Sequence, residues 1–243
     1  MDNECRTAIV TGASSGIGIA ICNDLLKNSY NVYGFGRDFS DSEHRGLDVS
    51  NESFNMIQCD LLDTAKMTEY INHIRREEEI SLLVNNAGVG YYGLHEELNV
   101  SKIQNMVRTN LEVPMILTNM LLRDLKKTKG RIINISSVTA DELNPRGCAY
   151  GATKAGLKSF SDSLFEESRK YGIKVTSILP DMTRTNLYRN ADFREDEDIR
   201  AYLLAEDVAQ AVDYIINARE DMVVREIKLM PQLHKISRKK REI

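Results

Sequence analysis

The sequence predicts an α/β fold in which a parallel sheet of about seven strands is covered by helices on both faces. Short β-rich apolar runs alternate with longer segments whose apolar residues recur at helical spacing. Several runs are almost continuously apolar, which is typical of strands buried on both faces of a parallel sheet. The 243 residues suffice for one such domain but are few for two. The alternation therefore favours a single doubly wound domain with right-handed crossovers.

The expected elements follow one another along the whole chain. Strands are expected at residues 7–11, 31–35, 55–59, 82–85, 131–136, 174–179 and 226–230. Helices are expected at residues 17–27, 64–76, 101–127, 149–170 and 206–218. We expect residues 38–52 to form a loop and the charged residues 183–200 to form a mobile cover over a pocket. The domain is expected to span residues 1–236, followed by a solvated basic tail at 237–243.

The composition excludes several classes of partner. The net charge of −4 and the pI near 5.7 argue against a general affinity for nucleic acid. No apolar run reaches the roughly 18 residues of a membrane span, and no signal-peptide core opens the sequence, so we expect a cytoplasmic protein that does not bind membranes. The four cysteines form no CxxC pair and the four histidines lack ligand spacing. We therefore expect neither a disulfide framework nor a metal site.

A glycine-rich turn follows the first expected strand and leads directly into a helix. Glycines allow such a turn to be tight and its backbone to approach a pyrophosphate closely. The N–H groups at the helix N-terminus then face the negative charge. The strand before the turn and the helix after it supply the context that a glycine motif alone lacks. The sequence therefore predicts a Rossmann-type dinucleotide site with contacts from Gly12, Ser14, Ser15, Gly16, Ile17 and Gly18.

Five short motifs lie at fixed places along the chain. They are Thr11-Gly12-x3-Gly16-x-Gly18, Asn85-Asn86-Ala87-Gly88, Asn110, Ser137 and Tyr150-x3-Lys154. Their order and spacing resemble those of the short-chain dehydrogenase/reductase family over essentially the whole chain. The resemblance implies an oxidoreductase that moves a hydride between a nicotinamide and a carbonyl or alcohol carbon. It also implies cofactor contacts at Asp60, Leu61, Asn86, Ala87, Gly88, Tyr150, Lys154, Pro180, Thr183 and Thr185, while Asp181 replaces the glycine of the family's proline–glycine pair.

Tyr150 and Lys154 are four residues apart, so their side chains share one face of the expected helix. A free tyrosine has a pKa near 10, and a nearby ammonium favours the phenolate. We therefore expect Lys154 to lower the pKa of Tyr150, which would act as the general acid and base. Ser137 would donate a hydrogen bond to the substrate oxygen. By the resemblance, Lys154 also holds the nicotinamide ribose and Asn110 holds a water that relays protons.

The end of the second expected strand predicts NADP rather than NAD as cofactor. A carboxylate there would accept hydrogen bonds from the adenine ribose and repel a 2′-phosphate. This sequence has Gly36 followed by Arg37, whose guanidinium can pair with a 2′-phosphate. The pattern resembles that of the NADP-preferring members of the family. Asp38 leaves alternatives open, because it could neutralise Arg37, hold the ribose, or form a solvated pair with the arginine.

The resemblance implies a small carbonyl or alcohol compound as substrate. By the resemblance, the expected pocket segments are residues 86–94, 138–149 and 180–200, which offer Tyr91, Tyr92, Leu94, Leu143, Met182, Leu187 and Tyr188. An apolar ketone, steroid-like or aliphatic, is the first expectation and a small polar hydroxy acid the second. A nucleotide sensor without turnover is a third hypothesis, although such proteins usually lose the tyrosine or lysine. Family members self-associate, which implies a homodimer or homotetramer through residues 101–127 and 149–170.

Overall fold

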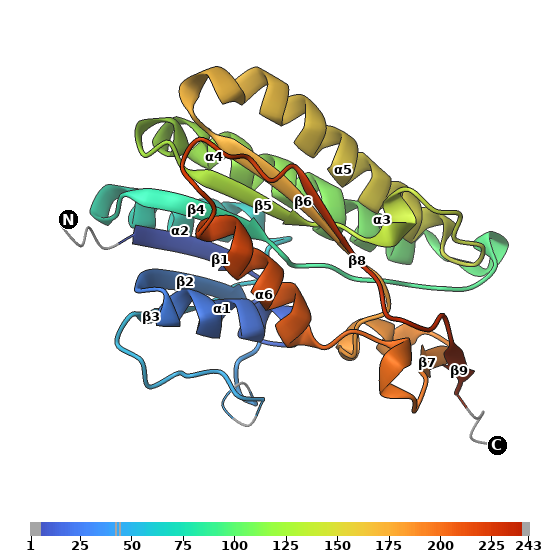
Figure 1. Cartoon of the computed structure of the whole chain (residues 1–243). Coiled ribbons are helices and arrows are strands. Elements are labelled where there is room, and N and C mark those ends of the chain that lie inside the picture. Colours follow the sequence, from blue (N-terminus) through green and yellow to red (C-terminus); the bar gives the residue numbers. More distant parts are fainter. Residues whose placement is uncertain (1–5, 42, 44, 240–243) are drawn as a thin grey trace.

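The computed structural model describes residues 6–41, 43 and 45–239. Its main sheet has seven parallel strands in the order β3-β2-β1-β4-β5-β6-β8 (Figure 1). The strands are β1 (Arg6–Thr11), β2 (Tyr30–Gly36), β3 (Phe54–Gln58), β4 (Ile80–Asn85), β5 (Arg131–Ile135), β6 (Lys174–Pro180) and β8 (Glu226–Leu229). The predicted doubly wound parallel sheet is confirmed.

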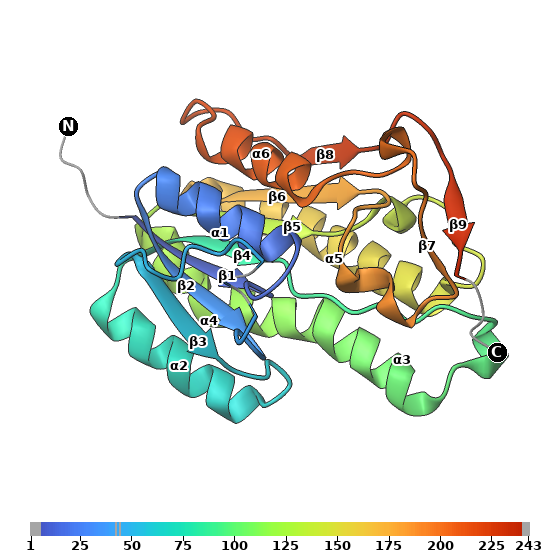
Figure 2. The same ribbon diagram turned by 90° about the horizontal axis from the view of Figure 1, so that it is seen from below.

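Helices cover both faces of this sheet (Figure 2). They are α1 (Ile17–Lys27), α2 (Thr64–Glu77), α3 (Val100–Val107), α4 (Val113–Lys127), α5 (Cys148–Ser168) and α6 (Ala205–Ile216). Ala8 and Val10 of β1 pack with α1 and α6, whereas Ile9 between them packs with α2, α4 and α5. All three side chains are fully buried. Because consecutive strand residues point to opposite faces, burial on both faces explains the continuous apolar runs.

The segment expected to form one helix at 101–127 is interrupted. A π-helical turn, Arg108–Glu112, separates α3 from α4. Pro114 lies in the first turn of α4 and has no N–H to donate to the carbonyl of Asn110 four residues earlier. The α-helical ladder therefore cannot continue through this point, and π turns of this kind are frequent at functional sites.

A second, two-stranded sheet joins the segment 183–200 to the C-terminal part of the chain. Strands β7 (Phe193–Glu195) and β9 (Ile236–Arg238) pair antiparallel and lie side by side in Figures 1 and 2. The backbone N–H of Lys239 also donates to the carbonyl of Asp192 at 2.9 Å. Ser237 and Arg238 therefore form a strand although we expected a tail there; residues 240–243 of that tail lie outside the described residues. The segment 183–200 has backbone anchors that its many charges did not predict.

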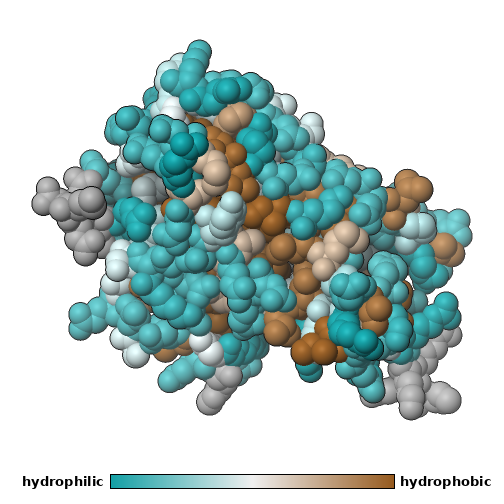
Figure 3. Space-filling view, in the orientation of Figure 1, coloured by the Kyte–Doolittle hydropathy of each residue, from teal (hydrophilic) through white to brown (hydrophobic). Residues whose placement is uncertain are grey.

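Hydrophilic side chains cover most of the face in Figure 3, and hydrophobic ones gather in a band across its middle. The edge strand β8 alternates exposed and partly buried residues, because Ile227 and Leu229 pack on the core at one face while the other face is open. Among the helices formed by residues 6–41, 43 and 45–239, none is long and apolar enough to cross a bilayer.

Candidate active site

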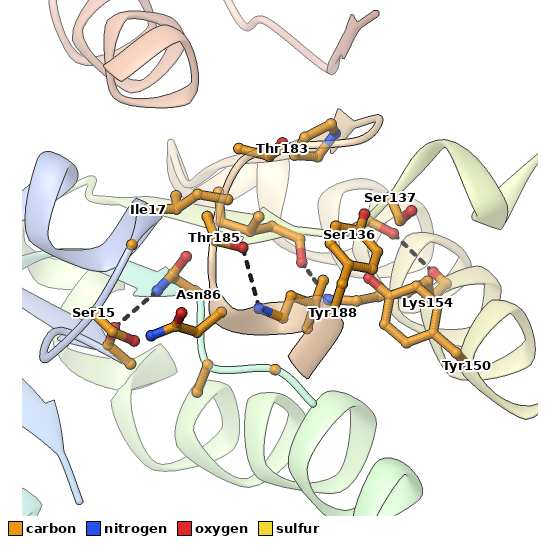
Figure 4. Close-up of a pocket in the computed structure, with 18 of the residues that line it drawn as sticks. Ser15, Ile17, Asn86, Ser136, Ser137, Tyr150, Lys154, Thr183, Thr185 and Tyr188 are labelled. Atoms are coloured by element: carbon orange, nitrogen blue, oxygen red, sulfur yellow. Dashed lines mark hydrogen bonds between the residues drawn. The ribbon is translucent and has the colours of Figure 1, made fainter. Parts of the chain in front are cut away.

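Two adjoining cavities open at the carboxyl edge of the sheet, where β1 and β4 are neighbours. The chain turns to opposite sides of the sheet after these two strands, and doubly wound folds bind ligands at such a point. Both cavities are lined by Gly12, Ser15, Ala87 and Gly88. Figure 4 shows the first cavity, with Ser137, Tyr150 and Lys154 at one end and Ser15 and Asn86 toward the other. The glycine turn and the predicted catalytic residues therefore share one elongated site.

The glycine turn has no space for larger side chains. Gly12 has a φ of +68°, and a Cβ there would lie 2.9 Å from the Cα of Ala87. Such a conformation and such a close approach both require glycine. Gly18 plays a different part, because its Cβ would lie 2.0 Å from the carbonyl oxygen of Gly12. Gly18 lines neither cavity, and its lack of a side chain lets α1 pack against the turn, while the expected cofactor contact at this residue stays a prediction.

Hydrogen bonds tie the glycine turn to the end of β4. The hydroxyl of Thr11 accepts hydrogen bonds from the backbone N–H groups of Asn86 and Ala87, each at 3.0 Å. The Asn86 side-chain amide donates to the carbonyl of Thr11 at 2.9 Å. These bonds hold the two strand ends in a fixed spacing, and Asn86, Ala87 and Gly88 line the first cavity beside the turn.

The end of the site that holds the predicted catalytic residues is built from β5 and α5. Ser137 follows β5, and Tyr150 and Lys154 stand one helical turn apart on α5. All three side chains line the first cavity, and Tyr150 and Lys154 are 4% and 3% exposed. The Lys154 ammonium lies 5.8 Å from the centroid of the Tyr150 ring and donates to the carbonyl of Ile135 at 2.8 Å.

Burial controls the protonation of both groups. It raises the pKa of Tyr150 to about 12, against a smaller opposing effect of the Ser137 hydrogen bond. Burial also lowers the pKa of Lys154 to about 8. In the protein alone the pKa of Tyr150 therefore lies above its ordinary value, whereas we expected it to lie below. The desolvation of a phenolate exceeds the effect of an ammonium at this distance.

Asn110 is fully buried and lines neither cavity. Its side-chain amide donates to the carbonyl of Val89 at 2.9 Å and to the hydroxyl of Thr153 at 3.1 Å. Its side-chain carbonyl accepts from the N–H of Val89 at 2.8 Å. The side chain therefore joins the segment after β4 to α5. Pro114, four residues later, has no N–H to donate to the backbone carbonyl of Asn110.

The second cavity is lined by residues expected to contact the adenosine half of a cofactor, namely Ser14, Arg37, Asp60 and Leu61. A Cβ at Gly36 would lie 2.8 Å from the Cβ of Ser14 and 2.8 Å from the ring of Phe39. A carboxylate therefore has no room at position 36. The carboxylate of Asp38 accepts a hydrogen bond from the N–H of Ser40 at 2.9 Å, and this bond lowers its pKa.

Pro180, Thr183 and Thr185 line the first cavity, as the resemblance implied. A Cβ added at Gly16 would lie 3.0 Å from the Cγ2 of Thr185, so this threonine rests directly against the glycine turn. The same cavity wall includes Asp181, which the sequence marked only as a departure from the family pattern. Thr183 donates its hydroxyl to the carbonyl of Asp181 at 2.8 Å and so closes the turn after β6.

An aromatic cluster lies beside Tyr150. The ring centroid of Tyr92 is 5.6 Å from that of Tyr150, 5.9 Å from that of Tyr188 and 5.1 Å from that of Phe193. Phe193 belongs to β7 and lies within residues 180–200, which were expected to border the pocket. Of the residues expected in the substrate pocket, Leu187 and Tyr188 line the first cavity, whereas Leu143 is 97% exposed.

Two cations near the cofactor cavities were not among the predicted contacts. Arg45 donates to the backbone carbonyl of Ser14 at 3.4 Å. Arg189 lines both cavities. Neither arginine belongs to a recognisable motif. A single arginine in a polar segment has no local pattern that distinguishes a ligand-binding residue from a solvated one.

Comparison with known proteins defines the family. The family described as "short chain dehydrogenase" matches residues 6–196. An uncharacterized oxidoreductase of Staphylococcus epidermidis is 31% identical over 231 residues, which cover 93% of this chain and 97% of that protein. Serine 3-dehydrogenase of Agrobacterium fabrum is 30% identical over 234 residues, which cover 93% of each chain. A metagenomic short-chain oxidoreductase in complex with NADP superimposes with a TM-score of 0.79 at 26% identity, covering 94% of this chain and 98% of that one.

This chain belongs to the short-chain dehydrogenase family. The predicted family and the oxidoreductase class are thereby confirmed.

Proposed function

We propose that this protein is an NADPH-dependent carbonyl reductase that also catalyses the reverse alcohol oxidation. The observation that carries the proposal is the convergence of Ser137, Tyr150 and Lys154 on the cavity that the glycine turn lines. The crowded Gly12 and Gly16 positions fit a dinucleotide, because they keep side chains out of the path of a pyrophosphate.

A nicotinamide bound at the catalytic end would supply or take up the hydride. Tyr150 carries its proton at neutral pH, because burial raises its pKa to about 12, and so it is set to protonate the substrate oxygen during reduction. Ser137 donates a hydrogen bond to the same oxygen as negative charge develops there. Lys154, with a pKa near 8, holds a proton close to neutral pH and favours the Tyr150 phenolate left behind. In oxidation that phenolate takes the proton back.

The preference for NADPH is supported by the end of β2. Arg37 lines the adenosine cavity, and Gly36 leaves no room for a ribose-binding carboxylate. The carboxylate of Asp38 accepts a hydrogen bond from the N–H of Ser40 in the turn after β2. The metagenomic relative with bound NADP is consistent with this preference.

The substrate class we favour is an apolar ketone or alcohol. Tyr188 and Leu187 line the first cavity, and the Tyr188 ring packs with those of Tyr92 and Phe193, so the cavity has an apolar wall. A small hydroxy acid is the second candidate. Asp181 and Arg189 in the first cavity could hold charged substituents, and a relative at 30% identity is a serine 3-dehydrogenase.

A spectrophotometric screen tests both ideas. Apolar ketones and small hydroxy or keto acids are offered with NADPH and with NADH, and absorbance at the nicotinamide band is followed. We expect turnover with NADPH and with apolar carbonyls. Exclusive turnover of charged hydroxy acids would support the second substrate class. Tight cofactor binding with no turnover of any compound would favour the nucleotide sensor.

We also propose a homo-oligomer, dimer or tetramer. The apolar and aromatic residues of α5, a helix expected to carry the contacts, pack largely within the single chain: Leu157, Leu164 and Phe165 are buried and Phe160 is partly buried. The proposal now depends on the neighbouring helices, where Val107 and Met115 are 41% and 39% exposed. Light scattering should give at least twice the mass of one chain, and replacement of Met115 by Lys should lower that mass.

A further inference from the structure

Arg189 lies where the two cavities meet. It belongs to the 3-10 turn Asn186–Asn190 that follows β6, and its side chain lines both cavities. The other residues that line both come from the glycine turn and the end of β4, namely Gly12, Ser15, Ala87 and Gly88. Arg189, from the segment after β6, therefore lies with the glycine turn at the junction of the two cavities. In an extended dinucleotide this is the position of the pyrophosphate.

The partners of Arg189 set it apart from the other arginines of its segment. Arg184, Arg194 and Arg200 each form an ion pair with a carboxylate, from Glu195, Glu197 and Asp198 respectively. Arg189 donates only to the backbone carbonyl of Asn186, at 3.1 Å. Across the part of the chain that the structure describes, no carboxylate lies within ion-pair distance of it. Its charge is therefore free to pair with an anion in the site.

The distribution of lining cations points to the same anion. Lys154 lines only the first cavity and Arg37 only the second, while Arg189 lines both. The glycine turn from Gly12 to Gly18 offers N–H groups but carries no cationic side chain. A guanidinium matches phosphate oxygens through two parallel charge-assisted hydrogen bonds.

We infer that Arg189 closes over the glycine turn and binds the pyrophosphate of the dinucleotide. This inference rests on the proposed cofactor use. The segment after β6 would then bind the cofactor directly, in addition to bordering the expected substrate pocket. Loss of cofactor would then leave the guanidinium without its anion and weaken closure of this segment.

The C-terminal part of the chain positions Arg189. The ammonium of Lys239 donates to the backbone carbonyls of Tyr188 and Arg189, at 2.7 and 3.2 Å. The pairing of β7 with β9 brings Lys239 to this place. Lys239 is therefore a positioning residue that acts on the cofactor through the backbone of the turn.

Binding measurements on the full chain test the inference. Dissociation constants of NADPH, NADH and 2′-AMP are measured by isothermal titration calorimetry for the wild type, Arg189→Gln and Arg194→Gln. Arg189→Gln should raise the constants for NADPH and NADH by a similar factor, about tenfold or more, which is typical of a lost charge-assisted hydrogen bond. Binding of 2′-AMP, which lacks a pyrophosphate, should be unchanged. Arg194 is exposed, paired with Glu197 and absent from both cavities, so Arg194→Gln should match the wild type.

Salt dependence and a second variant separate binding from folding effects. The affinity of Arg189→Gln for NADPH should fall less steeply with added salt than that of the wild type, because one screened charge contact is gone. Lys239→Met should weaken NADPH binding less than Arg189→Gln does, and should add little in the Arg189→Gln background. Unchanged NADPH and NADH affinity in Arg189→Gln would overturn the inference. A wild type that binds neither dinucleotide would overturn the proposed function itself.

Discussion

The ammonium of Lys154 donates a hydrogen bond to the backbone carbonyl of Ile135, the last residue of β5, over 2.8 Å. Lys154 lies one helical turn after Tyr150 on α5, and Ile135 lies two residues before Ser137. The bond therefore holds the ammonium between the elements of the two predicted catalytic hydroxyl groups, α5 and the end of β5. The ammonium is buried, and burial lowers its pKa to about 8. The end of the site with the predicted catalytic residues therefore contains a buried ammonium whose charged form is disfavoured by burial.

Lys154→Met should not destabilise the protein, and it should abolish turnover. A pKa lowered from 10.5 to about 8 corresponds to roughly 3 kcal/mol of disfavoured charge, against about 1–3 kcal/mol for leaving the Ile135 carbonyl unpaired. We expect a free energy of unfolding at pH 7 between unchanged and about 2 kcal/mol higher, by chemical denaturation. A large loss of stability would show that the ammonium is a net stabilising group.

The same pKa gives this variant a pH signature. Between about pH 8 and pH 10.5 the unfolded chain binds more protons at Lys154 than the folded chain does, so this group makes wild-type stability rise with pH. The stability advantage of Lys154→Met should therefore shrink across this range. Lys158→Met is the matched control on the same helix. The pKa of Lys158 is raised by its hydrogen bond to Glu226, so the comparison with that variant should not show this trend.

Replacement of Arg37 should change cofactor choice. Arg37→Ala removes the guanidinium at the adenosine cavity and should raise the KM for NADPH by about 10- to 100-fold, with little change for NADH. Equal losses with the two cofactors would show that Arg37 does not contact the 2′-phosphate. Gly36→Asp should fail to confer NADH preference and should destabilise the protein, because its Cβ would lie 2.8 Å from the Cβ of Ser14.

Asn110 should be as important for stability as for catalysis. Asn110→Ala leaves both the N–H and the carbonyl of Val89 without their partner in a buried place, and should lower the free energy of unfolding by about 2–4 kcal/mol. Thr153→Val removes only the 3.1 Å contact to Asn110 and the bond to Tyr150, and should cost about 1 kcal/mol. If the two variants were equally stable, the bonds to Val89 would be energetically unimportant.

The elements that could be predicted well from the sequence are those that depend on residues close together in the chain. The buried strands were predicted from their apolar runs. The glycine turn was predicted from its place between β1 and α1. Asp63, near an expected helix start, does accept a hydrogen bond from the N–H of Lys66. Each of these features depends on neighbours a few residues away, which periodicity and capping rules describe.

The features that were missed depend on distant parts of the chain or on burial. Strand β7 is a short, partly exposed segment that pairs only with β9, whose residues come more than forty positions later. Burial raises the pKa of Tyr150, and Tyr92 packs beside its ring. The burial of Tyr150 depends on the folded chain and could not be predicted from the spacing of Tyr150 and Lys154. The interruption of the helix at Asn110 did have a local signal, since Pro114 cannot donate to that carbonyl. Arg189 had none.

In the mechanism that we propose, Tyr150 moves the proton while the glycine turn holds the cofactor. The most direct test compares wild type and Tyr150→Phe for turnover of a carbonyl substrate found in the screen and for NADPH affinity by calorimetry. The variant keeps the ring that packs against Tyr92 and loses only the hydroxyl. We expect kcat to fall by about 10²- to 10⁴-fold, with the dissociation constant of NADPH within a factor of about three of the wild type. Near-normal turnover by Tyr150→Phe would contradict this mechanism.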